Sequence, residues 1–384
     1  MKRKHEDADD AASWEAAGRR ILGPDFRGPL IVLSPCCGLE TQLLAWHRLG
    51  VEVASHCWDT DWRLRAAIAS AHRLAGGSGQ IHLGQNQGNF TRQILSELPD
   101  ADMVSAGPPC PPFSRSGNQL TWDDPRAQPF LSCMLCIIDQ ASRNKGRFKA
   151  FILENVAGMA DKLKGSKKSS LDEVLEYLRD SLTPFGFKIW AWRLNASNLG
   201  LPQNRDRIYI CGRKAAAFLN PQPCLAASDI RLKMACLRSI LDPELPSNRQ
   251  NLSGKKAQNL AWYDEALLKI RKRKQLPEDA VCCFDLSRSP GKVRKPVYRS
   301  DGRIMCLTAS NAYIWVKAFK APHFDRFLSG RERLLLQGLD VALAGSLEDS
   351  QSLMVCATGN AMAMPCIGVA CACLWSGFNT SGTS

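Results

Sequence analysis

The stretch DMVSAGPPCPPFSRSG, residues 102–117, is the most informative segment of the chain. It begins as a short apolar strand and passes at Gly107 into a loop with four prolines, whose rings fix φ and stiffen the backbone. This loop presents Cys110 directly after the strand. A thiol on a rigid loop at the carboxyl end of a strand is suited to nucleophilic catalysis. A buried structural cysteine is the alternative interpretation, because the chain has 16 cysteines.

Strand and helix patterns alternate on both sides of this stretch. Apolar segments bounded by turn residues predict strands at 29–34, 51–58, 81–84, 102–107, 150–155, 188–195 and 206–212. Helical spacing predicts helices at 39–50, 61–77 and 171–182. The alternation predicts an α/β fold with a doubly wound, mostly parallel, Rossmann-like sheet, in which ligands bind at the carboxyl ends of the strands.

The regular pattern is lost after Lys214 and returns near residue 328. A chain of 384 residues is long enough for two or three domains. We therefore expect four parts: a flexible charged tail (1–27), a catalytic and cofactor-binding domain (28–213), a smaller basic domain (214–327), and a C-terminal segment (328–384) that returns to the catalytic domain.

The positive charge of the chain is concentrated in residues 231–303. This segment has 17 Lys or Arg against 8 Asp or Glu, which gives +9 of the total net charge of +13. Its densest clusters are IRKRKQ (270–275) and GKVRKPVYR (291–299), with aromatic residues between them. Two such clusters favour contact with nucleic-acid phosphates, although a solvated polar face is the alternative interpretation of either one.

The cysteines and the apolar tail exclude other classes of protein. The N-terminus MKRKHEDADD has no apolar signal segment, so we expect reduced thiols and no disulfide framework. The pair Cys133 and Cys136 lies in an apolar stretch, and a zinc site usually needs two such pairs, so we expect no metal. The apolar run 361–375 has 15 residues, which is too short to span a membrane, and it predicts a core helix.

Two further motifs place polar residues at the same edge of the predicted sheet. In AFILENVAGM (150–159), Glu154 and Asn155 follow an apolar strand. A protonated carboxyl group at that position can donate a proton or a hydrogen bond to a substrate. A helix cap or a surface turn is the alternative. In LPQNRDRIYICG (201–212), Arg205 and Arg207 are two residues apart at the start of a predicted strand, so we expect them to lie on one face. Two guanidinium groups on one face suit recognition of a phosphate or a carbonyl group. A structural ion pair is the alternative.

In this order and spacing, the motifs PPCxxFS, ENV, QxRxR and GNA (359–361) resemble the cytosine-5 DNA methyltransferase family. There are 44 residues from Cys110 to Glu154 and 53 from Glu154 to Arg207. The segment RERLLLQGL (331–339) also resembles that family. The resemblance covers roughly residues 30–213 and 303–375, and any one motif alone is weak.

The resemblance implies a role for each residue. Cys110 takes the place of the nucleophile that adds to cytosine C6, and Glu154 that of the acid that holds N3. Asn155 would help to position the base, while Arg205 and Arg207 would hold it. The implied substrate is a cytosine flipped out of double-stranded DNA, because the basic segment 231–303 lies where this family has its target-recognition domain.

The implied cofactor is S-adenosyl-L-methionine, and here the sequence departs from the family. In LSPCCGLE (33–40), Pro35 and Cys37 stand where glycines are expected, and in SHCWD (55–59) His56 or Cys57 stands where the family has a ribose-binding acid. We expect Trp58 to stack on adenine, with a core aromatic as the alternative. The full set of expected cofactor residues is Cys36, Gly38, Leu39, Trp58, Asp59, Asn89, Pro108, Asn360 and Ala361.

Two other functions stay open at this point. One branch of the family methylates transfer RNA, although the segment CLTASNAYIW (306–315) is a poor match to that branch. A catalytically silent nucleic-acid-binding protein is the other, because the cofactor loop is altered. The expected location is the nucleus if the source is eukaryotic and the cytoplasm otherwise; the oligomeric state is not predicted.

Overall fold

The computed structural model describes residues 13–379, except 25, 27, 115–119, 144–145, 164, 224, 291–296, 319–323 and 349, and the side chains of residues 92 and 93. The chain forms two compact units. Unit 1 comprises Met1–Leu199, Asp206–Lys233 and Met362–Ser384, and unit 2 comprises Gly200–Arg205 and Met234–Ala361.

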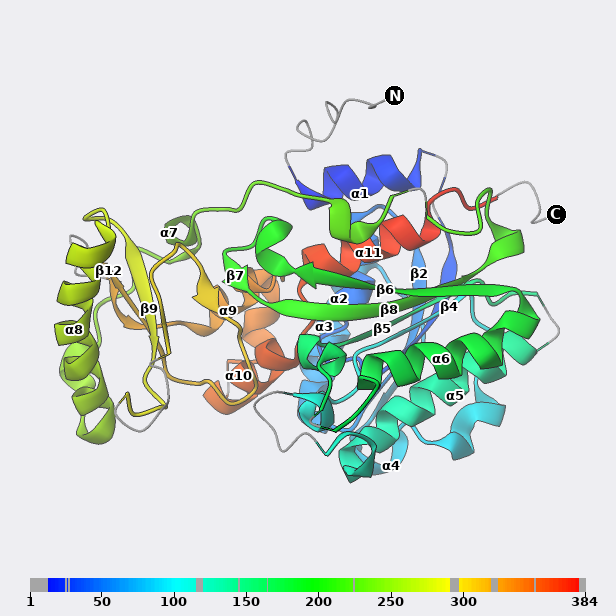
Figure 1. Cartoon of the computed structure of the whole chain (residues 1–384), viewed down its shortest axis with the longest axis horizontal. Coiled ribbons are helices and arrows are strands. Elements are labelled where there is room, and N and C mark those ends of the chain that lie inside the picture. The colour runs from blue at the N-terminus through cyan, green and yellow to red at the C-terminus, as the bar shows by residue number, and fades with distance from the viewer. Residues whose placement is uncertain are drawn as a thin grey trace. The chain divides into compact units, whose positions relative to one another are not determined.

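Unit 1 is built on a seven-stranded sheet in the order β3-β2-β1-β4-β5-β8-β6 (Figure 1). Its strands are β1 (Leu30–Pro35), β2 (Val53–Asp59), β3 (Ile81–Leu83), β4 (Met103–Ala106), β5 (Ala150–Val156), β6 (Phe187–Asn195) and β8 (Asp206–Lys214). The pairs from β3 to β5 are parallel, whereas β8 runs antiparallel to both β5 and β6. The predicted mostly parallel α/β sheet is confirmed.

Helices cover both faces of this sheet, which explains why its central strands are apolar on both faces. In Figure 1, α5 and α6 lie on one face, and α1, α2 and α11 lie on the other. All four residues of β4 are buried, as are the first six residues of β5. The helices of unit 1 are α1 (Trp14–Leu22), α2 (Thr41–Arg48), α3 (Arg65–Ala75), α4 (Gly84–Gln87), α5 (Gln128–Ser142), α6 (Ser170–Leu182) and α11 (Met364–Trp375).

Part of the predicted charged tail is helical. Helix α1 begins after Ser13, whose side-chain oxygen accepts a hydrogen bond from the backbone N–H of Ala16 at 3.2 Å. The helix packs on α11 so closely that a Cβ at Gly368 would lie 2.1 Å from the Trp14 ring. Residues expected in a flexible tail because of their charge therefore form an amphipathic helix. Residues 1–12 lie outside the described part of the chain.

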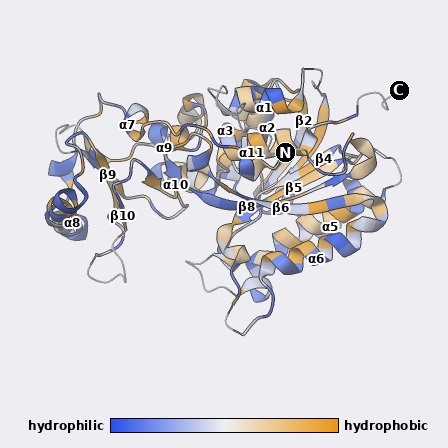
Figure 2. Ribbon diagram, turned by 45° about the horizontal axis from the view of Figure 1, so that its top comes forward, coloured by the Kyte–Doolittle hydropathy of each residue, from blue (hydrophilic) through white to orange (hydrophobic). Residues whose placement is uncertain are grey.

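Unit 2 contains a four-stranded antiparallel sheet, β10-β9-β12-β13, and a two-stranded parallel pair, β11-β7. The strands are β7 (Gln203–Asn204), β9 (Val281–Asp285), β10 (Tyr298–Arg299), β11 (Ile304–Met305), β12 (Ile314–Ala318) and β13 (Asp325–Phe327). The helices are α7 (Leu237–Ile240), α8 (Gly254–Lys274), α9 (Gly330–Leu336) and α10 (Gln351–Asn360). Helix α8 is mostly hydrophilic in Figure 2 and buries only a narrow stripe that includes Leu260, Tyr263 and Leu267.

The boundaries of the two units differ from the domain boundaries expected at 213/214 and 327/328. Unit 2 begins only at Met234, and it includes α9 and α10 as well as residues Gly200–Arg205. Of the expected returning segment, α11 is the helix that belongs to unit 1. The expected boundaries were placed where the pattern of strands and helices is lost and returns. The units differ because they are defined by packing between segments that are distant in the sequence.

The stretch Gln351–Trp375 is long and apolar enough to cross a membrane, and it is the one such stretch among the described residues. Within the protein, 89% of its apolar window is buried, so it is weak evidence for a membrane span. The stretch is divided into α10 and α11, and all twelve residues of α11 are buried, as predicted for a core helix.

Candidate active site

Cys110 lies on a loop that is anchored by aromatic packing. After β4 ends at Ala106, the chain reaches Cys110 through Gly107 and two prolines, and Cys110 precedes a short 3-10 helix, η3 (Pro111–Phe113). The Phe113 N–H donates to the Cys110 carbonyl at 3.0 Å. The Phe113 ring is 2% exposed and lies 4.9 Å from the ring of Trp122. Cys110 itself is partly exposed, as a nucleophile must be.

Glu154 lies beside the start of this loop. In the parallel pairing of β4 with β5, Ala106 is opposite Leu153, so Glu154 follows one residue later, next to Gly107. A Cβ added to Gly107 would lie 3.8 Å from Glu154 Oε2 and 3.0 Å from the Met362 methyl group. The glycine therefore makes room for Met362, and the Glu154 carboxylate lies at ordinary contact distance from this position, at the carboxyl edge of the sheet.

Asn155 fastens the loop to β5. Its amide nitrogen donates to the Pro108 carbonyl at 3.3 Å, and its Oδ1 accepts from the Val156 N–H at 2.8 Å. The side chain is 1% exposed. The resemblance implies that this residue positions the base, whereas the contacts show that its amide positions the backbone that carries Cys110.

Arg207 completes the group at the same edge. It lies opposite Val156 in the antiparallel pairing of β5 with β8. Its Nε is 3.1 Å from Glu154 Oε1, and its Nη1 donates to the Asp206 carbonyl at 2.9 Å. The two charged side chains are 12% and 9% exposed, so the ion pair is largely screened from water. The structure thus brings four of the five predicted catalytic residues to one edge of unit 1.

Arg205, the fifth, belongs to unit 2 instead. Because β8 begins at Asp206, the strand alternation that would pair Arg205 with Arg207 is broken. The Arg205 guanidinium is 2% exposed and donates to three backbone carbonyls of unit 2: Leu307 at 2.8 Å, Gly359 at 3.2 Å and Ala361 at 2.7 Å. These contacts make Arg205 a cross-link inside unit 2.

Two glutamines in the recognised motifs were given no role by the sequence. Gln203 is fully buried, donates to the Leu336 carbonyl at 2.6 Å and accepts from the Leu307 N–H at 3.0 Å. Gln337 donates to the carbonyls of Thr358 and Ala361. Their position inside QxRxR and RLLLQGL was the available signal, but a sequence cannot show that the partners are backbone groups of distant segments.

The loop after β1 is tied to the end of β2. The Cys37 N–H donates to the Trp58 carbonyl at 3.1 Å, and the Gly38 N–H donates to Asp59 Oδ2 at 2.9 Å. Asp59 also accepts from the Asp61 N–H at 2.9 Å. Burial raises the pKa of Asp59, and the two backbone hydrogen bonds oppose that effect. Asp59 therefore organises the loop on which the cofactor residues are expected.

Glycines control the space around this loop. Gly38 has a φ of +54° and nothing within 4 Å of the position of a Cβ, so open space adjoins the loop. At Gly88, a Cβ would lie 1.8 Å from the Asp59 carbonyl oxygen, so this glycine allows the chain to pass close to the end of β2. The next residue, Asn89, is exposed, whereas Leu39 is fully buried.

Trp58 is a core aromatic in this structure. Its ring is 4% exposed and stacks on the ring of His82, with centroids 4.9 Å apart and planes 4° apart. The ring of Phe90 approaches it edge-on at 5.2 Å. One face of the Trp58 ring, on which adenine stacking was expected, is thus covered by His82.

The remaining expected cofactor residues are distributed between the units. Cys36, with a φ of +54°, and Pro108 belong to unit 1. Asn360 and Ala361 belong to unit 2. The Asn360 amide donates to the Cys356 sulfur at 3.6 Å, and the Ala361 carbonyl accepts from Arg205.

Burial distinguishes several other thiols from Cys110. It raises the pKa of seven thiols, which keeps them protonated and weakly nucleophilic near neutral pH: Cys37, Cys136, Cys211, Cys282 (to about 11), Cys283, Cys371 and Cys373 (to about 12). Cys110 is partly exposed and lies on the loop that begins at Gly107, next to Glu154, which distinguishes it from these seven.

Several charges of the basic segment are neutralised locally. Arg271 pairs with Glu278 at 3.3 Å, and Arg299 and Arg303 both contact Asp301. Burial opposes ionisation of Asp301, but the two arginines outweigh it and lower its pKa to about 2. The cluster at 291–296, with its three cationic residues, lies outside the described residues.

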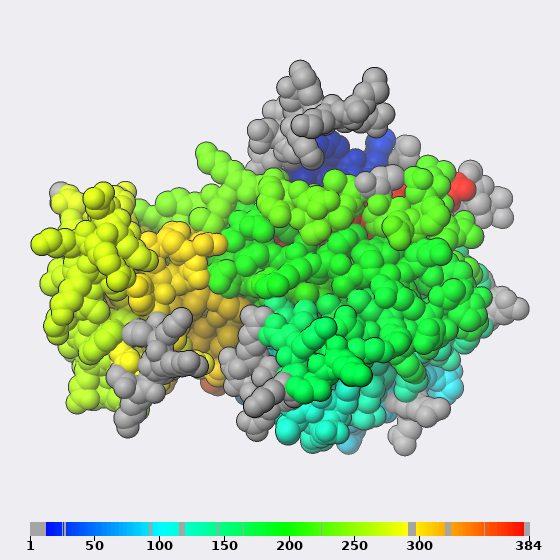
Figure 3. Space-filling view, in the orientation of Figure 1, coloured from blue at the N-terminus to red at the C-terminus, as the bar shows by residue number. Residues whose placement is uncertain are grey.

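The end of α8 keeps exposed positive charge. Lys272 and Arg273 are both exposed, and α8 forms much of the surface of unit 2 in the view of Figure 3, where it is yellow-green. Trp262, on the same helix, is 42% exposed. This helix is therefore the part of the basic segment that is best suited to contact phosphate groups.

Comparisons with known proteins agree with these motifs. The sequence pattern of the C-5 cytosine-specific DNA methylase family matches residues 32–371. Type II methyltransferase M.NlaX of Neisseria lactamica is 34% identical over 139 residues, which are 35% of this chain and 40% of that protein. Type II methylase M.HgiEI of Herpetosiphon aurantiacus is 35% identical over 150 residues, 38% of this chain and 31% of that protein. The matches thus span less than half the length of these relatives.

Solved structures agree on the fold. The methyltransferase EhMeth of Entamoeba histolytica superposes with a TM-score of 0.57 at 17% identity, covering 91% of this chain and 98% of that one. A putative DNA modification methyltransferase from an Escherichia coli prophage superposes with a TM-score of 0.54 at 15% identity, covering 91% and 99%. Because the family pattern extends over most of the chain, through the loop of Cys110 and the strands of Glu154 and Arg207, the protein belongs to the C-5 cytosine-specific DNA methylase family.

Proposed function

We propose that this protein transfers a methyl group from S-adenosyl-L-methionine to C5 of cytosine in double-stranded DNA. The observation that carries the proposal is the convergence of Cys110, Glu154 and Arg207 at one sheet edge, with Asn155 holding the Cys110 loop. A nucleophile, a carboxyl group and a guanidinium in one place are the groups that attack on a pyrimidine ring requires.

The chemistry assigns one task to each of these residues. The Cys110 thiolate forms a bond to C6 of a flipped cytosine, and the displaced electron pair makes C5 nucleophilic. As negative charge develops at N3, the carboxyl group of Glu154, in its protonated form, donates a hydrogen bond to N3, and the nearby Arg207 guanidinium stabilises that charge. After methylation, a base removes the C5 proton, the C5–C6 double bond re-forms and the thiolate leaves.

Open space beside Gly38 and the exposed Asn89 support cofactor binding at the loop after β1. Cys36 and Gly38 would line it, with Asp59 fixing the Gly38 backbone, whereas the fully buried Leu39 would support the loop from the core. When bound, S-adenosyl-L-methionine supplies an electrophilic methyl group. Asn360 and Ala361, in unit 2, stay expected cofactor residues on the resemblance alone.

The direct test is methyl transfer from labelled cofactor to duplex DNA and, in parallel, to transfer RNA, with detection of 5-methylcytosine by mass spectrometry. We expect labelling of the DNA. Labelling of transfer RNA alone would replace DNA with RNA as the substrate. Labelling of neither, together with no calorimetric binding of the cofactor, would identify a silent nucleic-acid-binding protein.

Asn155→Ala is expected to lower kcat by roughly 10- to 100-fold, because a small displacement of a catalytic group is enough to cost that much. The substitution removes the bond to the Pro108 carbonyl and frees the Cys110 loop. Steady-state kinetics would measure the effect. Asn259→Ala is the matched control, since Asn259 is also a buried asparagine that donates to a carbonyl, that of Leu286 at 3.0 Å in unit 2. Equal kcat values for the two variants would contradict the role of Asn155.

The double variant Lys272→Glu/Arg273→Glu is expected to weaken DNA binding and to reduce the slope of log K against log salt by about 2, since each lost phosphate contact removes about 0.9. Fluorescence anisotropy at several salt concentrations would measure both. The control is Lys167→Glu/Lys188→Glu, which changes the same net charge at exposed lysines of unit 1. Equal losses in both double variants would show that net charge alone controls binding.

We also propose a cytoplasmic location. The relatives M.NlaX and M.HgiEI are bacterial, which supports the cytoplasmic alternative of the sequence prediction. The nuclear alternative has no support from these relatives. Fractionation of cells expressing the natural gene would test the location.

A further inference from the structure

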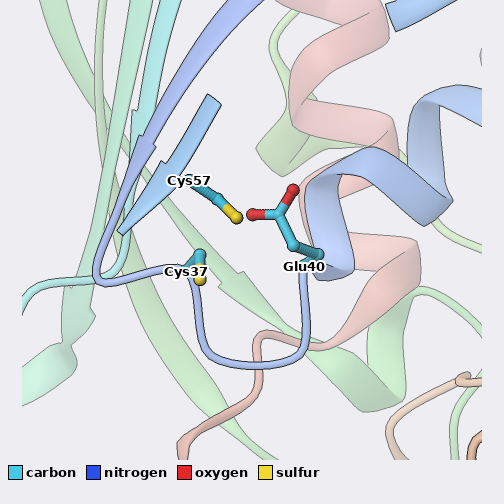
Figure 4. A group of neighbouring side chains, drawn as sticks. All are labelled: Cys37, Glu40 and Cys57. Carbon is cyan, nitrogen blue, oxygen red and sulfur yellow. The ribbon is translucent and has the colours of Figure 1, made fainter. Parts of the chain in front are cut away.

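Two cysteines at positions where the sequence departs from the family pattern lie close together in the structure. Cys37 stands where that pattern has a glycine, and Cys57 lies in the position before Trp58 where an acid is expected. In the structure, the Cys37 and Cys57 sulfurs and a carboxylate oxygen of Glu40 all lie within 4.8 Å of one another (Figure 4). All three residues are buried.

His72 adds a fourth donor from another element. Its Nε2, on α3, is 3.9 Å from the Cys57 sulfur and 3.6 Å from Glu40 Oε2. The other donors come from the loop after β1, from the residue that precedes α2 and from β2. The His72 side chain is 9% exposed and that of Glu40 is fully buried, so the group is closed to bulk water.

The Glu40 carboxylate is held in place by polar neighbours. Its Oε1 accepts from the Ser34 hydroxyl at 2.6 Å and from the Gln42 amide at 2.8 Å. Its Oε2 accepts from the Ser55 hydroxyl at 2.6 Å and faces His72. Such outer hydrogen bonds orient the ligands of metal sites. They fix the carboxylate with Oε2 toward His72.

The donor set matches the preferences of zinc. Two thiols, one imidazole and one carboxylate are zinc ligands in proteins, and zinc–ligand distances of about 2.0–2.3 Å place the donors of a tetrahedral site about 3.3–3.8 Å apart. The separations of His72 Nε2 from Glu40 Oε2 and from the Cys57 sulfur, 3.6 and 3.9 Å, are close to that spacing, whereas His72 is not in the group whose donors all lie within 4.8 Å of one another, so binding would draw its ring toward Cys37. A site with four protein ligands has no open position, which is typical of structural zinc.

We propose that Cys37, Cys57, His72 and Glu40 bind one zinc ion, which clamps the loop after β1 to β2 and α3. This site departs from the expectation of no metal, which considered only Cys-x-x-Cys pairs. The ion would fix the loop that contains Gly38 at the point where the family's usual glycines are replaced. The proposal does not depend on the proposed methyltransferase function.

The first test is the zinc content of the full-length protein, purified without chelators in reducing buffer and measured by plasma mass spectrometry. We expect about one zinc per chain, and a loss of tenfold or more in Cys37→Ala/Cys57→Ala. The matched control is Cys211→Ala/Cys371→Ala, which removes two buried thiols of unit 1 that neighbour each other. This control should retain its zinc.

Cobalt provides a test on the wild-type protein, which stays informative if the cysteine variant fails to fold. Replacement of zinc by Co²⁺ is expected to give thiolate-to-cobalt charge-transfer absorption and the intense visible bands of a tetrahedral site. Less than about 0.1 zinc per chain after dialysis against zinc, with no such absorption, would overturn the proposal. A Cys37–Cys57 disulfide, seen as a mass lower by two hydrogens in freshly purified protein, would also overturn it.

Discussion

Cys110→Ser is expected to lower kcat for methyl transfer by roughly a thousandfold or more, because removal of a covalent nucleophile removes the whole catalytic route. A serine hydroxyl at this position is a far weaker nucleophile than a thiolate. The loop should keep its conformation, because η3 and the packing of Phe113 do not involve the sulfur. Single-turnover transfer of labelled methyl groups to duplex DNA would measure the effect.

Cys236→Ser is the control for this experiment. Cys236 is an exposed cysteine of unit 2, and its replacement should leave kcat within about twofold of the wild type, as for surface substitutions in general. If Cys110→Ser retained activity within tenfold of the wild type, the nucleophile would be another residue, and the roles of Glu154 and Arg207 would have to be reassigned as well.

Arg205→Leu is expected to lower the free energy of unfolding by about 3–5 kcal/mol, because a buried guanidinium is removed and each carbonyl that it binds loses a charged donor. The three carbonyls that it binds come from Leu307, Gly359 and Ala361. Urea unfolding monitored by tryptophan fluorescence would report the loss, since Trp315 is fully buried in unit 2.

Arg249→Leu is the matched control. Arg249 also belongs to unit 2 and forms ion pairs with Asp264 and Asp325, but its side chain is 44% exposed. Its loss should cost about 1 kcal/mol or less. A variant Arg205→Leu that was as stable as the wild type but inactive would show instead that Arg205 acts on the base, as the family resemblance implies.

The sequence predicted the parts of the fold that depend on local patterns. The alternation of apolar strands and helices up to residue 213 predicted the sheet of unit 1, and the strand-end positions of the Glu-Asn and Pro-Pro-Cys motifs predicted that they lie at one edge of it. These succeed because strand period and turn chemistry are properties of neighbouring residues. The proline-stiffened loop is the clearest case, since its position after β4 follows from the residues themselves.

Other features depend on contacts between distant residues, which no local pattern contains. Asn155 binds the Pro108 carbonyl, 47 residues away, and Arg205 binds the Gly359 carbonyl, 154 residues away. The strand β8 begins at Asp206, as predicted, so Arg205 lies outside it and belongs to unit 2, whereas Arg207 belongs to unit 1. The stacking of Trp58 on His82 and the cluster around Cys37 and Cys57 are likewise visible only in three dimensions.

The central claim is that Cys110 forms a covalent bond to C6 of cytosine. The most direct measurement is incubation of the protein with the cofactor and duplex DNA containing 5-fluorocytosine, followed by denaturing electrophoresis and peptide mapping. Fluorine at C5 blocks the final elimination, so we expect a stable protein–DNA adduct on Cys110 that is absent in Cys110→Ser. An adduct on any other cysteine, or none with protein that methylates ordinary cytosine, would contradict it.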